Sequence, residues 1–410
     1  MIPFLRSLIS STTLTVLNFR YIFLNGVCLV FALNFTACQS TDPADSNKTK
    51  SEVVNSIKLP APAVISDAEK TKLHNACELW YDTVLKHTSF NGGMLVAKAG
   101  NIVFEQYNGT NPLGSKDSIN DQTAFHIASV SKTFTAMAVL KLVETGKLHL
   151  EDEFSKYFPT FNYPGITIQS LLSHRSGLPN YLYFMEDLGW NDTINIKNEN
   201  VFDYLVNRKA EIKNIAPPNT RFNYCNTNYS LLALLIEKIS GISYPQYIQQ
   251  TFFTPLNMTN SFVFTPAESK RASPNYDWRG QVIANNYLDY VYGDKNIYST
   301  PRDLLIWHRA LSSNLLFNAA TLEAAYQPYS NERPGIKNYG LGWRMNIYPN
   351  GKKVIFHNGW WHGNNASFIR LLDEDITIIV LGNRYNRGIY KVYKLINSFS
   401  NYFEILEVEE

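Results

Sequence analysis

Strand patterns stand at both ends of this chain, with a long helical region between them, and this order constrains the fold most. Residues 93–98 and 102–107 are apolar strand patterns joined by a turn at Ala99-Gly100-Asn101, which is typical of a hairpin. Strand patterns return at 339–348, 353–357, 366–372 and 376–381, whereas residues 129–258 have helical patterns. The order predicts an α+β fold in which one sheet is assembled from distant parts of the chain.

Helices are expected on both flanks of that sheet. Ser66-Asp67-Ala68-Glu69 has the pattern of a capped helix start, which predicts a helix over 67–86, and a last helix is expected over 390–403. No second linker and no internal repeat separates residues 65 and 405. We therefore expect a single domain over 65–410.

The first residues have the pattern of an export signal. Arg20 precedes an apolar run over 21–35, which ends in the small residues Thr36-Ala37 and then Cys38. The pattern resembles a bacterial lipobox, so we expect a signal peptide over 1–37, lipidation of Cys38 and a flexible lipid-anchored linker over 38–64. The alternative is an uncleaved membrane anchor. Both place the domain in the cell envelope, on the periplasmic or surface side of a membrane.

The charge balance limits the possible binding partners, and the cysteines and histidines limit the possible disulfides and metal sites. Without residues 1–37, which contain Arg6 and Arg20 and no acid, 35 basic and 35 acidic residues remain. This balance disfavours a nucleic-acid partner and favours a small-molecule or peptide substrate. Cys77 and Cys225 are expected to be small buried residues, with one disulfide as the alternative. The eight histidines lack metal-ligand spacing, so we expect no metal. We also expect no cofactor and a monomeric protein.

Ser129 and Lys132 are the first candidate catalytic pair. They lie at the start of a helix predicted over 130–144, and a spacing of three residues puts both side chains on one face. A serine hydroxyl becomes a nucleophile when a neighbouring base takes its proton. The S-x-x-K pattern occurs once in the sequence. The alternative is a surface serine and lysine at a helix start.

Tyr224 and Asn226 form the second candidate element, just before a strongly apolar helix predicted over 229–239. A phenol beside an ammonium has the chemistry of a general base toward Ser129. Two other Tyr-x-Asn matches, at Tyr329 and Tyr348, lie in polar turns.

The third candidate element is His357-Asn358-Gly359, at the end of a predicted strand. A glycine there lets a ligand approach the backbone, and the N–H of Trp360 would complete an oxyanion hole. The alternative is a strand end with a tight turn.

Taken in order, these three elements resemble the motifs of serine β-lactamases and penicillin-binding proteins, in the branch of class C β-lactamases, DD-carboxypeptidases and esterases. Connecting segments at 171–178, 254–258 and 297–304 resemble that branch too. The resemblance implies a β-lactamase/transpeptidase-like fold with an antiparallel sheet, flanking terminal helices and a helical lobe. It also implies acylation of Ser129, proton transfer by Lys132 and Tyr224, and contact of Asn226 with the substrate or with Lys132. His357, Gly359 and Trp360 would contact the substrate.

The expected function is therefore a serine hydrolase that forms a Ser129 acyl-enzyme on a D-amino-acid peptide, a β-lactam or an ester. Asn358 and His357 stand where the family usually has Thr and Lys, which weakens recognition of a substrate carboxylate. The alternative function is a catalytically silent penicillin- or peptidoglycan-binding lipoprotein.

His174 is expected to be structural. Four aromatic residues are expected to line either the cleft or the core: Tyr181, Tyr183, Phe184 and Trp190.

Overall fold

A computed structural model describes residues 56–400 and 402. The predicted signal peptide, Cys38 and linker residues 39–55 lie outside the described residues. Residues 56–64, the last part of the predicted linker, contain no helix or strand. The N–H of Ile57 donates to Pro255 O at 2.7 Å and that of Ala63 to Ala99 O at 3.0 Å. This part lies against the domain, which differs from the flexible tether expected up to residue 64.

Strands from both ends of the chain form one antiparallel sheet, as the sequence predicts. Its order is β2-β1-β12-β11-β10-β9-β8. The strands are β1 (Gly92–Lys98), β2 (Asn101–Asn108), β8 (Lys337–Tyr339), β9 (Arg344–Ile347), β10 (Lys353–Trp361), β11 (Asn364–Leu371) and β12 (Ile376–Gly382). The segment predicted as one strand over 339–348 is two strands. They separate at Gly342 (φ 83°), where a side chain would collide with Ala136.

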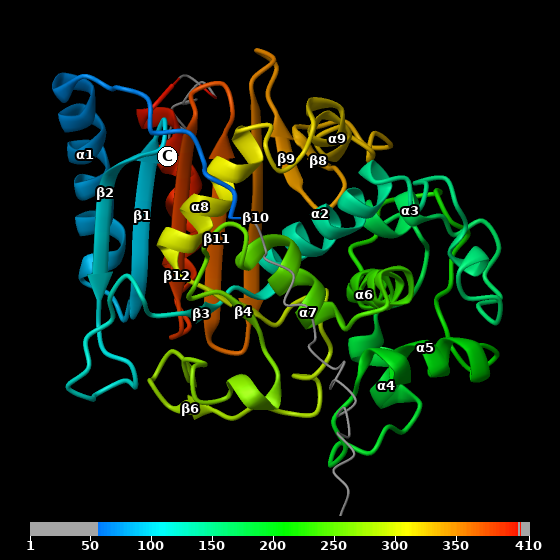
Figure 1. Ribbon diagram of the computed structural model, residues 1–410. Helices are drawn as coiled ribbons and strands as arrows, with labels where there is room; N and C mark the ends of the chain where they lie inside the picture. Colours follow the sequence, from blue (N-terminus) through cyan, green and yellow to red (C-terminus); the bar gives the residue numbers. More distant parts are fainter. Residues whose placement is uncertain (1–55, 401, 403–410) are drawn as a thin grey trace, which may run out of the picture. The chain divides into compact units, whose positions relative to one another are not determined.

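Helices cover the two faces of the sheet (Figure 1). Helix α1 (Asp67–Tyr81), continued by the π-helical turn η1 (Asp82–Lys86), packs on β2, and the 3₁₀ helix η6 (Arg387–Ser398) packs on β11 and β12. Helix α8 (Pro301–Ser312) packs on β1 and β12 from the other face. The helix expected over 390–403 is thus η6, which starts and ends earlier.

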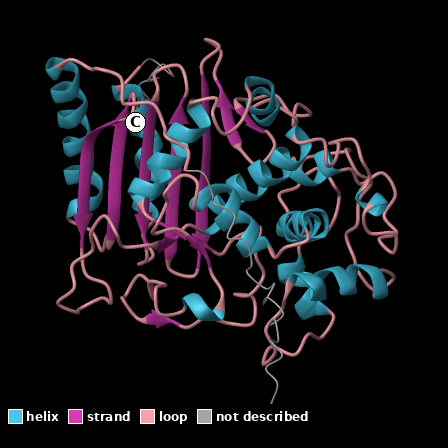
Figure 2. Ribbon diagram, in the orientation of Figure 1, coloured by secondary structure: helices cyan, strands magenta, loops and turns pink. Residues whose placement is uncertain are grey.

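A helical lobe lies beside the β10 side of the sheet (Figure 2). It is built from α2 (Ser131–Glu144), α3 (Ile168–Leu172), α4 (Tyr181–Asp187), α5 (Asn198–Asn207), α6 (Asn226–Ser240), α7 (Tyr244–Ile248) and α9 (Ala319–Ala325). Short 3₁₀ and π-helical turns connect these elements: η2 (Ala128–Val130), η3 (Phe154–Lys156), η4 (Gln249–Phe253) and η5 (Pro266–Glu268). Two small sheets join them: β3 (Phe125–His126), β7 (Ile297–Ser299) and β4 (Phe262–Val263), and β5 (Asn275–Tyr276) with β6 (Val282–Ile283).

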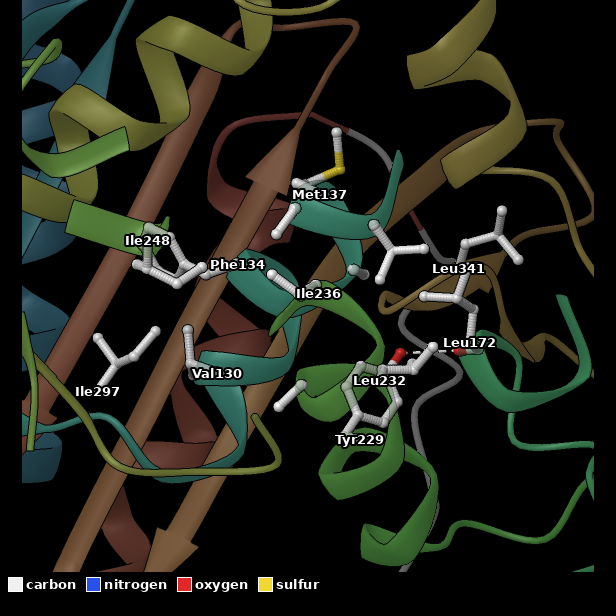
Figure 3. Close-up of a cluster of buried hydrophobic side chains, with 14 of the residues drawn as sticks. Val130, Phe134, Met137, Leu172, Tyr229, Leu232, Ile236, Ile248, Ile297 and Leu341 are labelled. Atoms are coloured by element: carbon white, nitrogen blue, oxygen red, sulfur yellow. Dashed lines mark hydrogen bonds between the residues drawn. The ribbon is translucent and has the colours of Figure 1, made fainter. Parts of the chain in front are cut away.

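Helix α2 runs through the centre of the domain and carries the candidate site at its start. Its residues are buried almost all round, including the polar Ser131, Lys132, Thr133 and Thr135 near its start, so the helix is packed on every side. Phe134 stacks on Trp307 of α8 at 4.4 Å between ring centroids. On the lobe side, the α6 residue Tyr229 donates a hydrogen bond to Leu172 O at 2.7 Å (Figure 3). One hydrophobic core therefore joins the sheet to the lobe and fixes α2 between them.

Cys77 and Cys225 are both buried and free. Among residues 56–400, no helix has the length and hydrophobicity needed to cross a membrane. The described residues also contain no cluster of three or more His, Cys, Asp or Glu side chains that could hold a metal ion.

Candidate active site

A tight turn between β3 and α2 presents Ser129. Ala128, just before it, has φ 48°, which is an uncommon backbone conformation for a residue with a side chain. The N–H of Ala128 donates to His126 Nδ1 at 3.0 Å, and His126 Nε2 lies 3.0 Å from Asn296 Oδ1. Burial lowers the pKa of His126 to about 4, so the ring is neutral and Nδ1 stays an acceptor. This histidine holds the turn in place, and the sequence analysis did not single it out.

Lys132 is fully buried, and its amine contacts Ser129 as predicted. Lys132 Nζ lies 3.2 Å from Ser129 Oγ, 2.8 Å from Asn226 Oδ1 and 2.7 Å from the main-chain O of Asp294. Asn226 begins α6, 94 residues after Lys132. Three acceptors thus surround the amine, and one of them is the candidate nucleophile.

Tyr224 lies next to this group but does not bond to it. Its ring centroid is 5.0 Å from Lys132 Nζ, and its hydroxyl has no hydrogen-bond partner among the described residues. His174 packs on the ring at 4.3 Å, and its Nδ1 accepts the N–H of Cys225 at 3.1 Å. His174 therefore fixes the Tyr224 segment, in agreement with a structural role.

Arg344, at the start of β9, is a cation of the site that the sequence analysis missed. Its guanidinium carbon lies 4.7 Å from the Tyr224 ring centroid, and the residue lines the cavity that contains Ser129. Within the described part of the chain, its side chain has no hydrogen bond and no acidic partner. A lone arginine in a strand carries no motif, so only the fold reveals its position.

His357 is placed differently from the expectation. Its side chain is fully buried behind the cavity wall, with Nδ1 2.8 Å from Asn358 O and Nε2 3.2 Å from the Tyr339 hydroxyl. Burial, together with the nearby charges of Arg344 and Lys132, lowers its pKa well below the usual value. The ring is therefore neutral, and it supports the strand instead of touching a substrate.

Gly359 is important for a reason other than the predicted one. A Cβ at this position would lie 2.3 Å from Ile127 O and 3.1 Å from Ser129 N. The absence of a side chain lets β10 approach the turn that carries the nucleophile, whereas the sequence analysis assigned that space to a ligand. The next residue, Trp360, stays at the rim with an exposed side chain.

A buried charged cluster lies behind Lys132. The Tyr181 hydroxyl donates to Asp294 Oδ2 at 3.1 Å and accepts from Lys295 Nζ, which is 3.5 Å from the same carboxylate oxygen. Burial lowers the pKa of Lys295. The cluster fixes Asp294, whose main-chain O holds Lys132.

The four aromatic residues that follow the 171–178 motif have different positions. Tyr183 is exposed and lines the cavity, whereas Tyr181 and Phe184 are buried. Trp190 packs on Tyr204 at 5.6 Å and belongs to the lobe.

One cavity of about 1000 Å³ opens onto these groups. Five of the predicted site residues line it: Ser129, Tyr224, Asn226, Gly359 and Trp360. Lys132 and His357 lie behind its wall. The arrangement joins a serine to a buried amine, beside the N–H groups of the turn and of β10. No side chain caps the start of α2. This is an arrangement for acyl transfer to a serine.

Comparisons with known proteins agree with this geometry. The family model described as Beta-lactamase matches residues 82–392. Penicillin-binding protein 4* of Bacillus subtilis is 31% identical over 325 residues, which cover 74% of this chain and 70% of that protein. Protein flp of Staphylococcus aureus is 28% identical over 353 residues, 80% of this chain and 67% of that protein. The crystal structure of a penicillin-binding protein from Bacillus halodurans has a TM-score of 0.68 at 24% identity and covers 80% of this chain and 99% of its own.

Proposed function

Since the chain belongs to the Beta-lactamase family, we propose that it hydrolyses an amide or ester through an acyl-enzyme on Ser129. The observation that carries this proposal is the environment of Lys132 Nζ. Asn226 Oδ1 and Asp294 O accept from this amine at 2.8 and 2.7 Å, and these two hydrogen bonds hold Nζ 3.2 Å from Ser129 Oγ, within reach of the hydroxyl proton.

The proposed reaction proceeds in two steps. Ser129 Oγ attacks the substrate carbonyl carbon while its proton passes to Lys132 Nζ. The N–H groups of Ser129 and Trp360 stabilise the oxyanion that forms. The leaving group departs with a proton supplied through Tyr224, and water then hydrolyses the ester on Ser129 to regenerate the hydroxyl.

Arg344 favours a substrate with a carboxylate, as in a D-amino-acid peptide of the cell-wall type. Guanidinium groups bind carboxylates through paired hydrogen bonds, and this one has no acidic partner among the described residues. It supplies a cation that neutral His357 does not, and so offsets the family lysine that this chain lacks. β-Lactams also carry a carboxylate, whereas simple esters do not, so esters are the weaker candidate.

The test is covalent labelling followed by intact-mass measurement. The protein is treated with a fluorescent penicillin or a fluorophosphonate, each with and without Ser129→Ala. We expect both adducts in the natural protein and neither in the variant, while Tyr224→Phe should slow acylation strongly. Labelling by the fluorophosphonate alone would indicate an esterase whose cleft excludes β-lactams. Full activity of the Ser129→Ala variant would refute the mechanism.

The alternative is a binding protein that keeps the fold but not turnover. Ser129, Lys132 and Tyr224 are all present in the site, which favours the enzyme. The lifetime of the penicillin adduct separates the two functions, because a hydrolase releases the acyl group and a silent binder retains it. No adduct with either reagent would favour the binding protein.

We also propose, from the sequence alone, that the protein is exported and lipid-anchored at Cys38 as a monomer. Cys38→Ala should release the protein from membranes and remove the lipid mass from its N-terminus. Retention of the variant in the membrane fraction would favour the uncleaved anchor.

A further inference from the structure

The cavity that contains Ser129 does not end at the catalytic groups. Strand β10 pairs with β9 only over Lys353 to Phe356, and from His357 onward its second edge has no strand beside it among the described residues. The cavity passes this edge and continues onto the outer face of the sheet, the face that carries η6. Its volume of about 1000 Å³ is at the upper end for ligand pockets.

Apolar side chains line the part of the cavity on the outer face, which we call the outer groove. They come from two strands, from η6 and from the loop before β8: Val354, Phe356, Ile369, Tyr393, Ile396 and Ile336. The charged residues at this end of the cavity, Lys337 and Arg344, belong to β8, the edge strand, and to β9 beside it. Asn358 and Ser367 line the same face, but their side chains bond to each other at 2.9 Å, so the apolar side chains make the outer groove suit a hydrocarbon group.

The outer groove lies between η6 and β10, which meet where the Tyr390 hydroxyl donates to Gly359 O at 2.6 Å. This helix packs mainly on β11 and β12, so the side chains of Val354 and Phe356 face the cavity. Asn346 is the cross-strand partner of Val354 and lines the same space from β9.

The position of Arg344 shows which part of a substrate would enter the outer groove. A leaving group that takes its proton from Tyr224 must lie beside that ring, and the Arg344 guanidinium carbon is 4.7 Å from the ring centroid. Arg344 is also the cross-strand partner of Phe356, one of the groove residues. The leaving group therefore lies at the mouth of the outer groove.

We propose that the outer groove binds a hydrocarbon side chain on the leaving group, while Arg344 holds that group's carboxylate. The preferred leaving group would then be a large apolar amino acid or a similar amphiphilic acid. This inference rests on the proposed acyl transfer for its meaning, but binding to the outer groove can be measured without turnover.

Straight-chain carboxylates, from butanoate to decanoate, are the probes, and calorimetry on the full chain measures their dissociation constants. Each methylene that becomes fully buried should lower the dissociation constant about fourfold. We expect a fall of at least tenfold between butanoate and octanoate. Octanoate should also slow fluorophosphonate labelling of Ser129, because the outer groove opens into the same cavity.

Asn346→Trp should fill the outer groove and abolish the dependence on chain length, while butanoate affinity stays unchanged. Ile336→Glu, a change in a half-buried loop residue, should have the same effect if the first variant folds poorly. The matched control is Asn350→Trp, the same substitution in the exposed turn between β9 and β10. The control variant should keep the dependence of the dissociation constant on chain length that the natural protein has.

A dissociation constant that does not change with chain length in the natural protein would overturn the proposal. Chain-length dependence that survives both groove variants would also overturn it, because the hydrocarbon would then bind elsewhere. Dependence that appears only after deletion of residues 403–410, which include Phe403, Ile405 and Leu406, would assign the outer groove to the chain's own terminus. Failure of Ser129 labelling, by contrast, would refute only the proposed acyl transfer.

Discussion

Gly359→Ala should disable the nucleophile while leaving every chemical group of the site in place. The new Cβ would lie 2.3 Å from Ile127 O and 3.0 Å from the Ala128 Cβ. Carbon and oxygen normally approach to about 3.3 Å, so β10 and the turn must separate by roughly 1 Å. This movement changes the distance between the N–H of Ser129 and that of Trp360, which together stabilise the oxyanion in the proposed mechanism.

A displacement of 1 Å in a catalytic site costs about 100-fold in rate, and overpacking a tight contact costs about 1–3 kcal/mol of stability. The assay is the second-order rate of fluorophosphonate acylation by intact mass, with thermal unfolding measured on the same samples. Gly382→Ala is the matched control, because it adds a methyl group in the same sheet with its nearest neighbours at 3.2 Å. We expect that control to react within about threefold of the natural protein. An equally fast Gly359→Ala variant would refute the argument that close approach of β10 positions Ser129.

Two further predictions concern buried ionisable groups. Lys295→Met leaves Asp294 buried without its cation, so it should cost about 3–5 kcal/mol of unfolding free energy and slow acylation through Lys132. The double variant with Asp294→Asn should recover most of the stability in chemical denaturation, and no recovery would show that the ion pair is not the cause. Burial lowers the pKa of His126 and of His308 to about 4, whereas an unfolded chain titrates near 6.5. Between these values the unfolded state binds more protons, so the free energy of unfolding should fall as the pH drops from about 6.5 to 4, by about 3 kcal/mol per histidine. A flat profile over that window, or an unchanged slope in His126→Gln, would contradict this assignment.

Most of the fold could be predicted from the sequence because periodicity and strand order are local signals. Short patterns predict the hairpin of β1 and β2, the contact between Ser129 and Lys132 three residues apart, and the capped start of α8 at Thr300. The interruption between β8 and β9 does not, because Gly342 is required by close contact with Ala136 of α2. Such a contact exists only after the sheet and the lobe have packed.

The site was predictable only where its residues belong to motifs. Asn226 meets Lys132 as expected, but the third acceptor is a main-chain oxygen of Asp294, which no side-chain pattern can indicate. The sequence singles out Gly359 as a point of close approach, but the group that approaches it is the turn that carries Ser129 and not a ligand. His357 was expected to face a substrate, and the alternation of β10 turns it inward instead.

The charges around the cavity indicate why neutral His357 need not weaken recognition of an anion. The chain as a whole is nearly neutral, with a formal net charge of +2. The charged residues that line the cavity are Lys295, Lys337 and Arg344 against the single acid Asp294, and Lys295 is already paired with that acid. In the proposed mechanism the leaving group departs on the side of the remaining two cations, which would attract an anionic group to that side. Arginine keeps its charge throughout the physiological range. Anion binding at Arg344 should therefore stay constant between pH 6 and 8, where a site built on a titrating histidine would lose it.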